Sequence, residues 1–339
     1  MKKIKVLIIG AGGIGGLNEF DKYRIRPCTH FGAFSKDKYF EVVGIVDSNY
    51  FKAKEFGKIF KISFFKSVMS ALEKTRPNLV TIAVPFHSHH KIVSQCAKSP
   101  YKPSSIFCEK PISNNIQNAR KIINTCKKNK IKLFVNNRRL ETVYQKLNNI
   151  IKRQFNNKII SIHGYCSSGI HTIGSHMLDL MRYICGDAKF VISTRDRKKI
   201  SKLPYSKNYK NSDPKIHSLI KFKSGVEGTF LCTAKTKYTY FEIEVLCESG
   251  KVRISDNGNK IEIWKMIRPS KSTLSYRLHN FNLKFKKSAL FQNISSHIKK
   301  SLIKGNKNNI LSGTEGFQTY SLMYALIVSS KKEKKIYVF

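Results

Sequence analysis

Acidic residues are scarce in this chain of 339 residues, which has only 21 Asp and Glu against 63 Lys and Arg and a formal net charge of +42. Long apolar runs are also missing. The longest candidates, Leu79–Phe86 and Leu322–Val328, fall well short of the ~18–20 residues that span a membrane. The basic start followed by Val6–Ile9 is too short for a signal peptide and continues into glycines. We therefore expect a soluble, cytoplasmic protein without a membrane span.

Cysteine spacings typical of metal sites or disulfide frameworks are missing too. The eight cysteines form no C-x-x-C pair and have no histidines at a matching spacing. Scattered thiols in a cytosolic chain are usually reduced core residues, so we expect neither disulfides nor zinc. His87, His89 and His90 cluster, but no carboxylate or thiol is spaced to complete a metal site with them. We therefore expect no bound metal.

No sequence signature gathers the excess positive charge onto a nucleic-acid-reading element. The basic residues extend from Lys2 to Lys335 without a helix-turn-helix, zinc-finger or RNP pattern. Such an excess still attracts polyanions, so weak, sequence-blind binding to DNA is expected at low salt and should vanish at physiological salt. A lysine-rich solvated surface without specific nucleic-acid recognition is the favoured interpretation, and a nucleic-acid-associated protein is the alternative.

Short apolar runs alternate with amphipathic segments over residues 1–135. Apolar runs bounded by Gly, Asp or Pro are typical of parallel strands that are buried on both faces. Their alternation with helical segments predicts an α/β fold with a doubly wound parallel sheet, a Rossmann domain over residues 1–135. The expected strands are Lys5–Ile9, Val42–Val46, Leu79–Val84, Ser105–Cys108 and Leu133–Val135, and the expected helices are Tyr50–Phe56, Lys66–Lys74, His89–Cys96 and Ile116–Asn129.

The pattern changes after Asn136. Apolar and polar residues begin to alternate with period two, which is typical of antiparallel strands with one buried face. Residues 136–339 are therefore predicted to form an α+β domain with a large, mainly antiparallel sheet. The expected helices are Thr142–Gln154 and about Ser175–Tyr183, and the expected strands are Ile159–Tyr165, Ile216–Phe222, Gly228–Thr233, Tyr240–Cys247 and Lys251–Ser255. The basic stretch Arg195–Pro214 is predicted to be a surface loop.

The strand at Val6–Ile9 runs directly into Gly10-Ala11-Gly12-Gly13-Ile14-Gly15. In a turn of this kind the first glycine permits the tight bend and the second lets a pyrophosphate approach the backbone. The last glycine allows close packing of the helix that follows. A strand before the glycines and a helix after them predict a dinucleotide-binding turn.

Asp47 ends the second expected strand, where a carboxylate can hold a ribose hydroxyl. It favours NAD over NADP, although Lys52 and Lys54 can offset a 2′-phosphate. Asp47 lies 37 residues after the first glycine, against roughly 20 expected after the motif. Because the segment Leu17–Cys28 makes up the excess, we expect the crossover helix to resume near Thr29, with Thr29 as its N-cap. A strand-end turn residue is the alternative role for Asp47.

Glu109 and Lys110 follow the apolar run Ile106–Cys108, and Pro111 fixes the turn. This places Lys110 at the carboxyl edge of the sheet, where open α/β folds bind their ligands. A partly desolvated lysine beside a cationic nicotinamide can move protons near neutral pH. Taken alone, a charged pair at a strand end is also typical of a surface ion pair.

Several motifs together resemble the Gfo/Idh/MocA family of glucose–fructose oxidoreductases and inositol dehydrogenases, and the likeness spans nearly the whole chain. Besides the glycine turn, the motifs are Ala83–His89, Glu109–Pro111, Asn137–Arg139, Gly174–Asp179 and Glu248–Lys251. The segment with Tyr23 and Thr29-His30 looks like a subgroup met in surface-glycan and nucleotide-sugar pathways.

The resemblance implies an oxidoreductase that uses NAD, with NADP still open, and moves a hydride between nicotinamide and a carbinol carbon of a sugar, nucleotide sugar or cyclitol. It implies that Lys110 is the catalytic lysine and that His176 exchanges the proton of the reacting hydroxyl. It also implies a homo-oligomer, a dimer or tetramer. The residues expected to bind the cofactor are Gly10, Gly12, Gly13, Ile14, Gly15, Asp47, Pro85, His89 and Glu109.

Thr172 stands where the family frequently has an aspartate, four residues before the histidine. Threonine supplies no charge at neutral pH, so Thr172 remains a candidate catalytic residue that cannot replace the aspartate's charge. Either Lys110 and His176 carry the proton, or His171 takes part as well. Asp179 can orient His176 or pair with an arginine one turn on. The alternatives to a dehydrogenase are an enzyme that keeps its cofactor and uses transient oxidation, for example in glycosidic cleavage, and a non-catalytic NAD-binding regulator.

Overall fold

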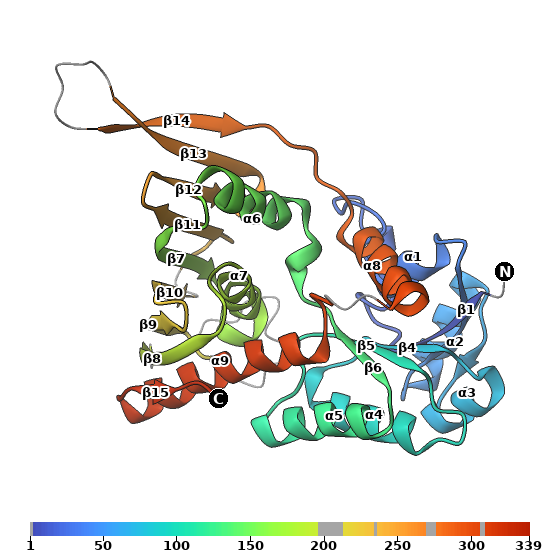
Figure 1. Cartoon of the computed structure of the whole chain (residues 1–339). Coiled ribbons are helices and arrows are strands. Elements are labelled where there is room, and N and C mark those ends of the chain that lie inside the picture. The colour runs from blue at the N-terminus through green and yellow to red at the C-terminus, as the bar shows by residue number, and fades with distance from the viewer. Residues whose placement is uncertain (1–2, 196–212, 234–235, 269–275, 306–308) are drawn as a thin grey trace. The chain divides into compact units, whose positions relative to one another are not determined.

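The computed structural model describes residues 3–195, 213–233, 236–268, 276–305 and 309–339 (Figure 1). The chain forms two compact units. The first contains residues 1–140 and 288–320, and the second contains residues 141–287 and 321–339.

The first unit is built on a six-stranded parallel sheet with the order β3-β2-β1-β4-β5-β6. The strands are β1 (Ile4–Ile9), β2 (Phe40–Val46), β3 (Phe64–Phe65), β4 (Leu79–Ile82), β5 (Ser105–Cys108) and β6 (Lys132–Val135). Every residue of β4 and β5 is buried, as the uninterrupted apolar runs require. The predicted doubly wound Rossmann sheet is thereby confirmed. Its order reverses between β1 and β4, which is where such sheets bind ligands.

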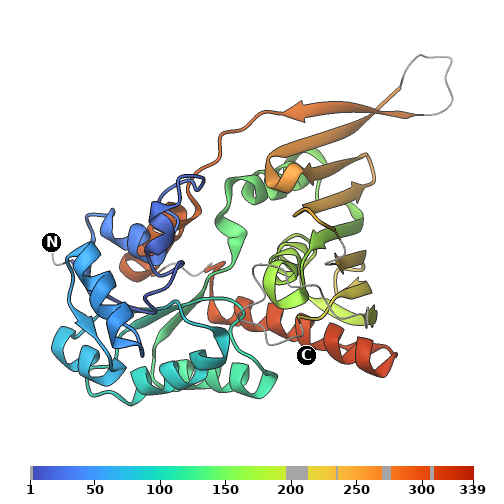
Figure 2. The same cartoon turned by 180° about the vertical axis from the view of Figure 1, so that it is seen from behind.

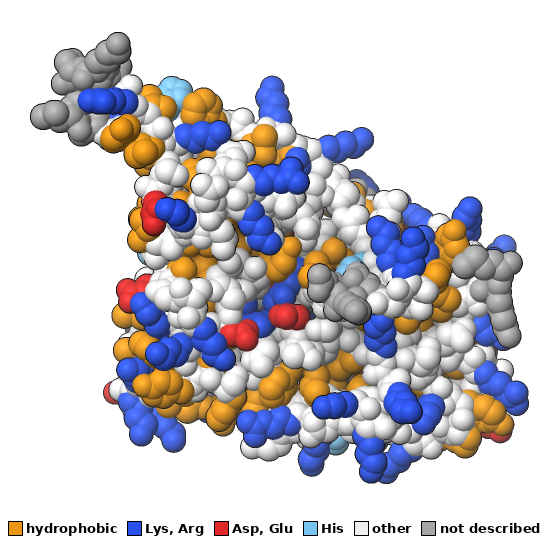
Figure 3. Space-filling model, viewed as in Figure 1, with side chains coloured by type: hydrophobic (Ala, Val, Ile, Leu, Met, Phe, Trp, Pro, Cys, Tyr) orange, Lys and Arg blue, Asp and Glu red, His pale blue; other side chains and the backbone are white. Residues whose placement is uncertain are grey.

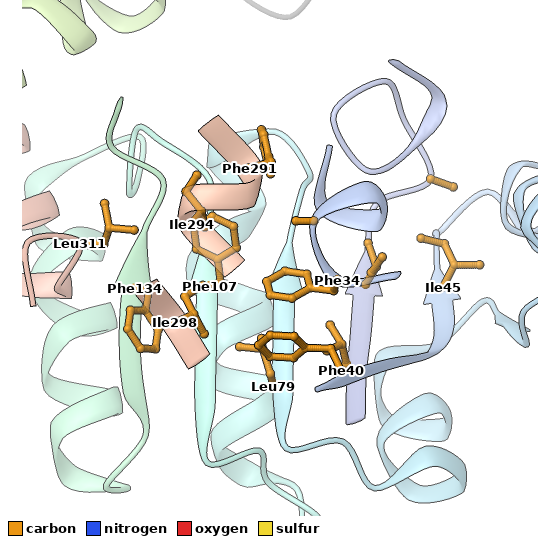
Figure 4. Packing of buried hydrophobic residues seen from close by; sticks show 14 of the residues in the cluster. Phe34, Phe40, Ile45, Leu79, Phe107, Phe134, Phe291, Ile294, Ile298 and Leu311 are labelled. Atoms are coloured by element: carbon orange, nitrogen blue, oxygen red, sulfur yellow. The ribbon is translucent and has the colours of Figure 1, made fainter. Parts of the chain in front are cut away.

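Helices cover the two faces of this sheet. They are α1 (His30–Ser35), α2 (Tyr50–Phe60), α3 (Val68–Thr75), α4 (His89–Lys98), α5 (Ile116–Lys128) and α8 (Leu290–Lys304), with short turns η1 (Leu17–Phe20), η2 (Phe86–Ser88) and η3 (Arg138–Leu140). Phe34 of α1 and Phe291 and Ile294 of α8 pack against Phe107 and Phe134 of the strands, as Figure 4 shows. Burying these apolar side chains stabilises the packing of α1 and α8 on one face of the sheet.

The position of α8 differs from the predicted division at residue 135, which assigned all of 136–339 to the second domain. Residues 288–320 return to the first unit. The amphipathic stripe of α8 carries Phe291, Ile294 and Ile298, all buried in the first core. Helix α9 (Gly313–Lys332) then begins with two glycines packed tightly on Leu133 and Val135 of β6. Periodicity shows that such helices are amphipathic, but it does not show which sheet they cover.

The second unit has a nine-stranded, mainly antiparallel sheet with the order β14-β13-β12-β11-β7-β10-β9-β8-β15. The strands are β7 (Ile159–Ser167), β8 (Ala188–Arg195), β9 (Ile216–Phe222), β10 (Glu227–Thr233), β11 (Phe241–Cys247), β12 (Gly250–Ser255), β13 (Lys260–Ile267), β14 (Arg277–Leu283) and β15 (Ile336–Tyr337). Helices α6 (Thr142–Gln154) and α7 (Ser175–Cys185) lie on one face (Figures 1 and 2). The predicted α+β fold is confirmed. The predicted loop Arg195–Pro214 lies outside the described residues except at its ends, Arg195 and Asp213-Pro214.

No helix in the described part of the chain is long and apolar enough to cross a membrane. Across the same residues, no group of three or more His, Cys, Asp or Glu side chains is arranged to hold a metal. Seven of the eight cysteines are buried, which agrees with their interpretation as core residues. On the face seen in Figure 3, Lys and Arg side chains are spread over many elements instead of gathering on one.

Candidate functional site

The glycine turn after β1 has no room for larger residues at two positions. Gly10 has φ +115°, and a Cβ there would lie 2.6 Å from the carbonyl oxygen of Ala83. A Cβ on Gly15 would lie 2.0 Å from the carbonyl oxygen of Gly10. Gly12 differs, because nothing lies within 4 Å of the Cβ position and the turn opens to solvent there. The sequence therefore needs Gly10 and Gly15 for the backbone and leaves space at Gly12.

Helix α1 continues the glycine turn across the 12-residue insertion Leu17–Cys28. The N–H of His30 donates to Ile14 O at 3.0 Å, and that of Phe31 donates to Gly15 O at 2.9 Å. Thr29 caps the helix, with Oγ1 accepting from Gly32 N, so the predicted restart and N-cap are confirmed. The insertion interrupts one crossover helix, which explains the long spacing to Asp47.

Glu19 holds this insertion against α1. One carboxylate oxygen accepts from Cys28 N at 2.7 Å and from Thr29 Oγ1 at 2.8 Å. A Cβ on Gly32 would lie 2.1 Å from the same oxygen, so only glycine leaves room for the carboxylate. The insertion is thereby fixed beside the glycine turn.

Asp47 has two backbone partners at the end of β2. Its Oδ2 accepts from Ala11 N in the glycine turn at 3.0 Å, and its Oδ1 accepts from Asn49 N at 2.9 Å. The bond from Asn49 N is typical of a residue that ends a strand in a turn, which was the alternative role for Asp47. The first bond ties the carboxylate to the turn, and each oxygen retains a further lone pair for a ribose hydroxyl. Asp47 therefore stabilises the turn after β2 and also lies where it can accept from a ribose hydroxyl of the cofactor.

Glu109, at the end of β5, is the centre of a buried polar network. Its Oε1 lies 2.9 Å from Nε2 of His30 and accepts from Asn136 Nδ2 at 2.6 Å. Burial by itself would raise the pKa of Glu109, but the bonds from His30 and Asn136 and the charge of Lys110 outweigh it and lower the pKa. The side chain of Glu109 is 13% exposed and that of His30 is fully buried. An ionised carboxylate thus joins α1, β5 and β6 at the carboxyl edge of the sheet.

His30 is neutral in the arrangement that best satisfies its partners. Its Nδ1 is buried without a hydrogen-bond partner among the described residues, and its ring packs against Phe107 and Phe291. If Nε2 carries the only proton and donates it to Glu109, Nδ1 is a bare acceptor, whereas protonation would bury an unpaired N–H.

Lys110 follows Glu109 directly and is half-buried. Its backbone N–H donates to Glu109 Oε2 at 3.3 Å, so the same carboxylate that binds His30 also fixes the start of the lysine turn. The Lys110–Pro111 peptide is cis.

Pro85 and His89, both expected to bind the cofactor, differ in burial: Pro85 is exposed and His89 is buried. Pro85 is exposed just before η2, on the same edge as the glycine turn. His89 is fully buried, with Nε2 2.9 Å from Val84 O and Nδ1 3.2 Å from Ile112 O. Burial lowers the pKa of His89 and keeps it neutral. The structure therefore places His89 as a brace between the turns after β4 and β5, while Pro85 lies on the surface.

In the second unit, His176 is the second residue of α7 and is half-buried. The preceding turn η4 (Ile170–Gly174) holds His171 and Thr172. Asp179 is buried one turn after His176. Arg182, its expected partner, binds Asp187, with Nε 3.1 Å from Oδ1.

Asp213 is a site residue that sequence reasoning missed. Its Oδ1 accepts from the backbone N of His171 at 2.8 Å and lies 3.0 Å from His171 Nδ1. Its Oδ2 accepts from the backbone N of Thr172 at 3.1 Å and from Thr172 Oγ1 at 2.8 Å. Because Asp213 is 41 residues from Thr172, no local spacing could indicate the contact. His30 and Asn136 were also missed, although the cap at Thr29 placed His30 at the start of a helix.

The glycine turn fits the pyrophosphate of a dinucleotide. Within the described part of the chain, the backbone N–H groups of residues 12–15 donate to no protein acceptor. Such clustered N–H groups bind anions, and the open space at Gly12 admits one. A doubly wound sheet with this turn and an acidic end on the next strand defines a dinucleotide-binding protein.

Two family models match the chain. The model for the oxidoreductase family with the NAD-binding Rossmann fold matches residues 4–137, and that for the GFO/IDH/MocA C-terminal domain matches residues 164–253. Together they cover about two thirds of the sequence. The chain belongs to the Gfo/Idh/MocA oxidoreductase family and has its NAD(P)-binding Rossmann domain.

Solved structures share the fold at low sequence identity. An oxidoreductase from Agrobacterium radiobacter, in complex with NAD+, L-tartaric acid and magnesium, is 18% identical, with a TM-score of 0.77 and 99% of this chain and 98% of that chain covered. The WlbA dehydrogenase from Bordetella pertussis, in complex with NADH and UDP-GlcNAcA, is 17% identical, with a TM-score of 0.78 and coverage of 100% and 99%. An NAD-binding oxidoreductase from Klebsiella pneumoniae is 15% identical, with a TM-score of 0.78 and 99% of each chain covered. No curated protein is similar enough in sequence to count as a relative.

Proposed function

We propose that the protein is an NAD-dependent dehydrogenase or reductase that acts on a CH–OH group of a sugar, nucleotide sugar or cyclitol, in surface-glycan biosynthesis. The observation that carries this proposal is the link made by His30. Its backbone N–H binds the glycine turn, and its imidazole binds Glu109, which in turn binds the N–H of Lys110. One residue thereby couples the dinucleotide-binding turn to the lysine. Burying an ionised carboxylate costs free energy, which a role in orienting the site explains better than a role in the sheet alone.

The bound nicotinamide would supply the acceptor or donor of the hydride. In the oxidising direction the C–H bond of the carbinol carbon gives the hydride, and the hydroxyl proton passes to Lys110, assisted by His176. Thr172 takes part only through its hydroxyl, which donates to Asp213. The glycine turn, with Pro85 and Asp47 beside it, binds the cofactor, while Glu109 and His89 hold the loops. The widespread positive charge suits a phosphate-linked sugar. A cytoplasmic location remains a prediction from the sequence.

Hydride transfer is the direct test. The purified protein with NAD+ should reduce the cofactor when given its sugar, with UDP-GlcNAcA as the first probe because the Bordetella structure contains it. Free glucose and myo-inositol, tested in parallel, show whether the nucleotide is needed. Mass spectrometry of the protein as purified identifies any retained dinucleotide. If no probe yields NADH and no dinucleotide binds, a dehydrogenase is contradicted; retained NAD with a cleaved sugar and no net NADH would favour transient oxidation.

Cofactor choice should depend on Asp47. We expect NADH to bind more tightly than NADPH, because the carboxylate repels a 2′-phosphate and accepts from a free hydroxyl. Asp47→Asn should narrow that preference by about tenfold, since Asn keeps an acceptor for Ala11 N but loses the charge. Fluorescence titration of both cofactors measures the ratio of their dissociation constants. Asp37→Asn, just before the amino end of β2, is the control. Tighter binding of NADPH by the wild type would refute the role of Asp47.

The predicted homo-oligomer has a candidate surface in the open face of the nine-stranded sheet. Helices α6 and α7 lie on one face, and in the described part of the chain no helix covers the other (Figures 1 and 2). Ile192 and Leu219 are direct neighbours on that open face and are 44% and 58% exposed. Tyr165 lies on the same face and is 38% exposed. A second copy of the chain would bury these side chains.

Leu219→Arg should therefore convert an oligomer to a monomer without lowering the melting temperature of the subunit. Sedimentation velocity gives the mass, and Ile59→Arg, an exposed change on α2, should leave the mass unchanged. A wild-type monomer, or an oligomer insensitive to Leu219→Arg, would rule out this surface.

A further inference from the structure

The carboxylate of Asp213 is completely used by two consecutive residues of η4. An ionised carboxylate offers about four lone-pair sites. Two are taken by the N–H and the Nδ1 of His171, and two by the N–H and the hydroxyl of Thr172. An exposed aspartate would be hydrated by water, whereas all four sites of Asp213 are used by groups of one turn. The side chain of Asp213 is only 9% exposed and that of His171 only 16%.

The fold makes room for this carboxylate. A Cβ on Gly169 would lie 2.1 Å from Cγ of Asp213, so any other residue there would push the carboxylate out of its position. Ser168, just before it, has φ +75° and places its hydroxyl 2.6 Å from Thr172 Oγ1. The hydroxyl of Ser168 can donate to Thr172, whose own proton then goes to Asp213. The turn thus directs its donors toward one carboxylate.

The bond to Nδ1 decides the chemistry of His171. A neutral imidazole has one N–H, and Asp213 can only accept, so the proton lies on Nδ1. The lone pair then belongs to Nε2, which becomes the basic nitrogen. When Nε2 takes a proton, the carboxylate stabilises the resulting imidazolium, as in other histidine–carboxylate pairs that exchange protons.

Two thiols and one lysine among the described residues lie near this pair. The thiols of Cys166 on β7 and Cys232 on β10 face Asp213, but burial raises the pKa of the first well above its usual range and that of the second to about 12, so both are neutral. Lys215 is the cation two residues along and is buried. On α7, the titratable side chains nearest in sequence to the turn are His176 and Asp179.

We propose that Asp213 is a positioning residue that supplies the negative charge Thr172 lacks and holds His171 in the Nδ1–H form, so that Nε2 of His171, in place of His176, assists Lys110 in exchanging the proton of the substrate hydroxyl. This inference rests on the proposed oxidoreductase function for its final step only. The arrangement of the imidazole is a property of the protein without substrate. Of the two candidate histidines, His171 and His176, the proposal therefore selects His171, whose Nδ1 lies 3.0 Å from Asp213 Oδ1.

Nitrogen NMR of ¹⁵N-histidine-labelled protein tests the arrangement without any substrate. The signal of His171, assigned with His171→Gln, should show Nδ1 protonated in the wild type. Asp213→Ala should shift it to the Nε2–H form that free imidazoles prefer. Gly169→Ala should produce the same shift, because it displaces the carboxylate without removing it. Asp256→Asn changes an exposed carboxylate of the same unit and should have no effect.

Kinetics with NAD+ and UDP-GlcNAcA then test the proton exchange. Asp213→Asn keeps an acceptor but loses the charge, so kcat should fall by at least about tenfold with KM nearly unchanged, and Asp213→Glu should recover part of the loss. A wild-type His171 protonated on Nε2, or an Nδ1–H form that survives Asp213→Ala, overturns the proposal. Turnover of Asp213→Asn at the wild-type rate overturns its catalytic step. If the NMR shifts occur but no probe is turned over by the wild type, the oxidoreductase proposal fails and the positioning of His171 stands.

Discussion

Lys110→Ala should lower kcat by about 10²–10⁴-fold while the affinity for NADH changes only a few-fold. The lysine follows β5 at the carboxyl edge of the sheet, and its backbone is fixed by Glu109. The glycine turn, whose N–H groups would hold the pyrophosphate, is built without the Lys110 side chain. Chemistry and cofactor binding should therefore separate cleanly in this variant. Stopped-flow kinetics with NAD+ and the probe that the wild type turns over measure the chemical step, and NADH fluorescence measures cofactor binding.

Lys110→Arg distinguishes a proton carrier from a fixed positive charge. Arginine keeps the charge but stays protonated under all conditions in proteins, so it cannot accept the hydroxyl proton. We expect this variant to be nearly as slow as Lys110→Ala. Lys102→Ala, an exposed lysine of the same unit, should retain full activity. Substantial turnover by Lys110→Arg would make the lysine an electrostatic residue and assign the proton to the histidines of the second unit.

Much of the fold could be predicted because its signals are local. The apolar runs of β4 and β5 and the cap at Thr29 each depend on a few consecutive residues, and the structure confirms them. The period-two alternation of β9 and β11 was equally clear. Helix α8 was different, since its buried stripe is as compatible with one sheet as with the other.

In the candidate site, too, residues in short local motifs could be predicted and contacts between distant segments could not. The glycine turn and Lys110 were predictable because each is a short motif at the end of a strand. The contacts of Glu109 with His30 and of Asp213 with Thr172 join residues 79 and 41 positions apart. Their partners are single side chains in segments with no pattern of their own. A sequence indicates the elements that carry a site, whereas polar pairs between distant elements follow only from how the elements pack.

Glu109→Ala should be the most destabilising single change in the first unit's polar network. It removes the acceptor of His30 Nε2–H and of Asn136 Nδ2, and both donor residues are buried. Leaving a buried donor without a partner costs about 1–3 kcal/mol for each donor. Urea unfolding should show a lower midpoint at an unchanged slope. Glu109→Gln keeps an acceptor oxygen and should lose much less.

The pH dependence of the same variants tests the charge of Glu109. Since folding lowers the pKa of this carboxyl from its usual 4.5, the folded state binds fewer protons than the unfolded chain, and stability rises with pH through this range. The contribution of Glu109 is complete above pH 4.5 and is lost as the pH falls through the lowered folded value. The difference in unfolding free energy between the wild type and Glu109→Gln should therefore be constant near neutral pH and shrink below pH 4.5. A difference that grows on acidification would mean that Glu109 is protonated in the folded protein, and the ionised link between His30 and the Lys110 turn would have to be abandoned.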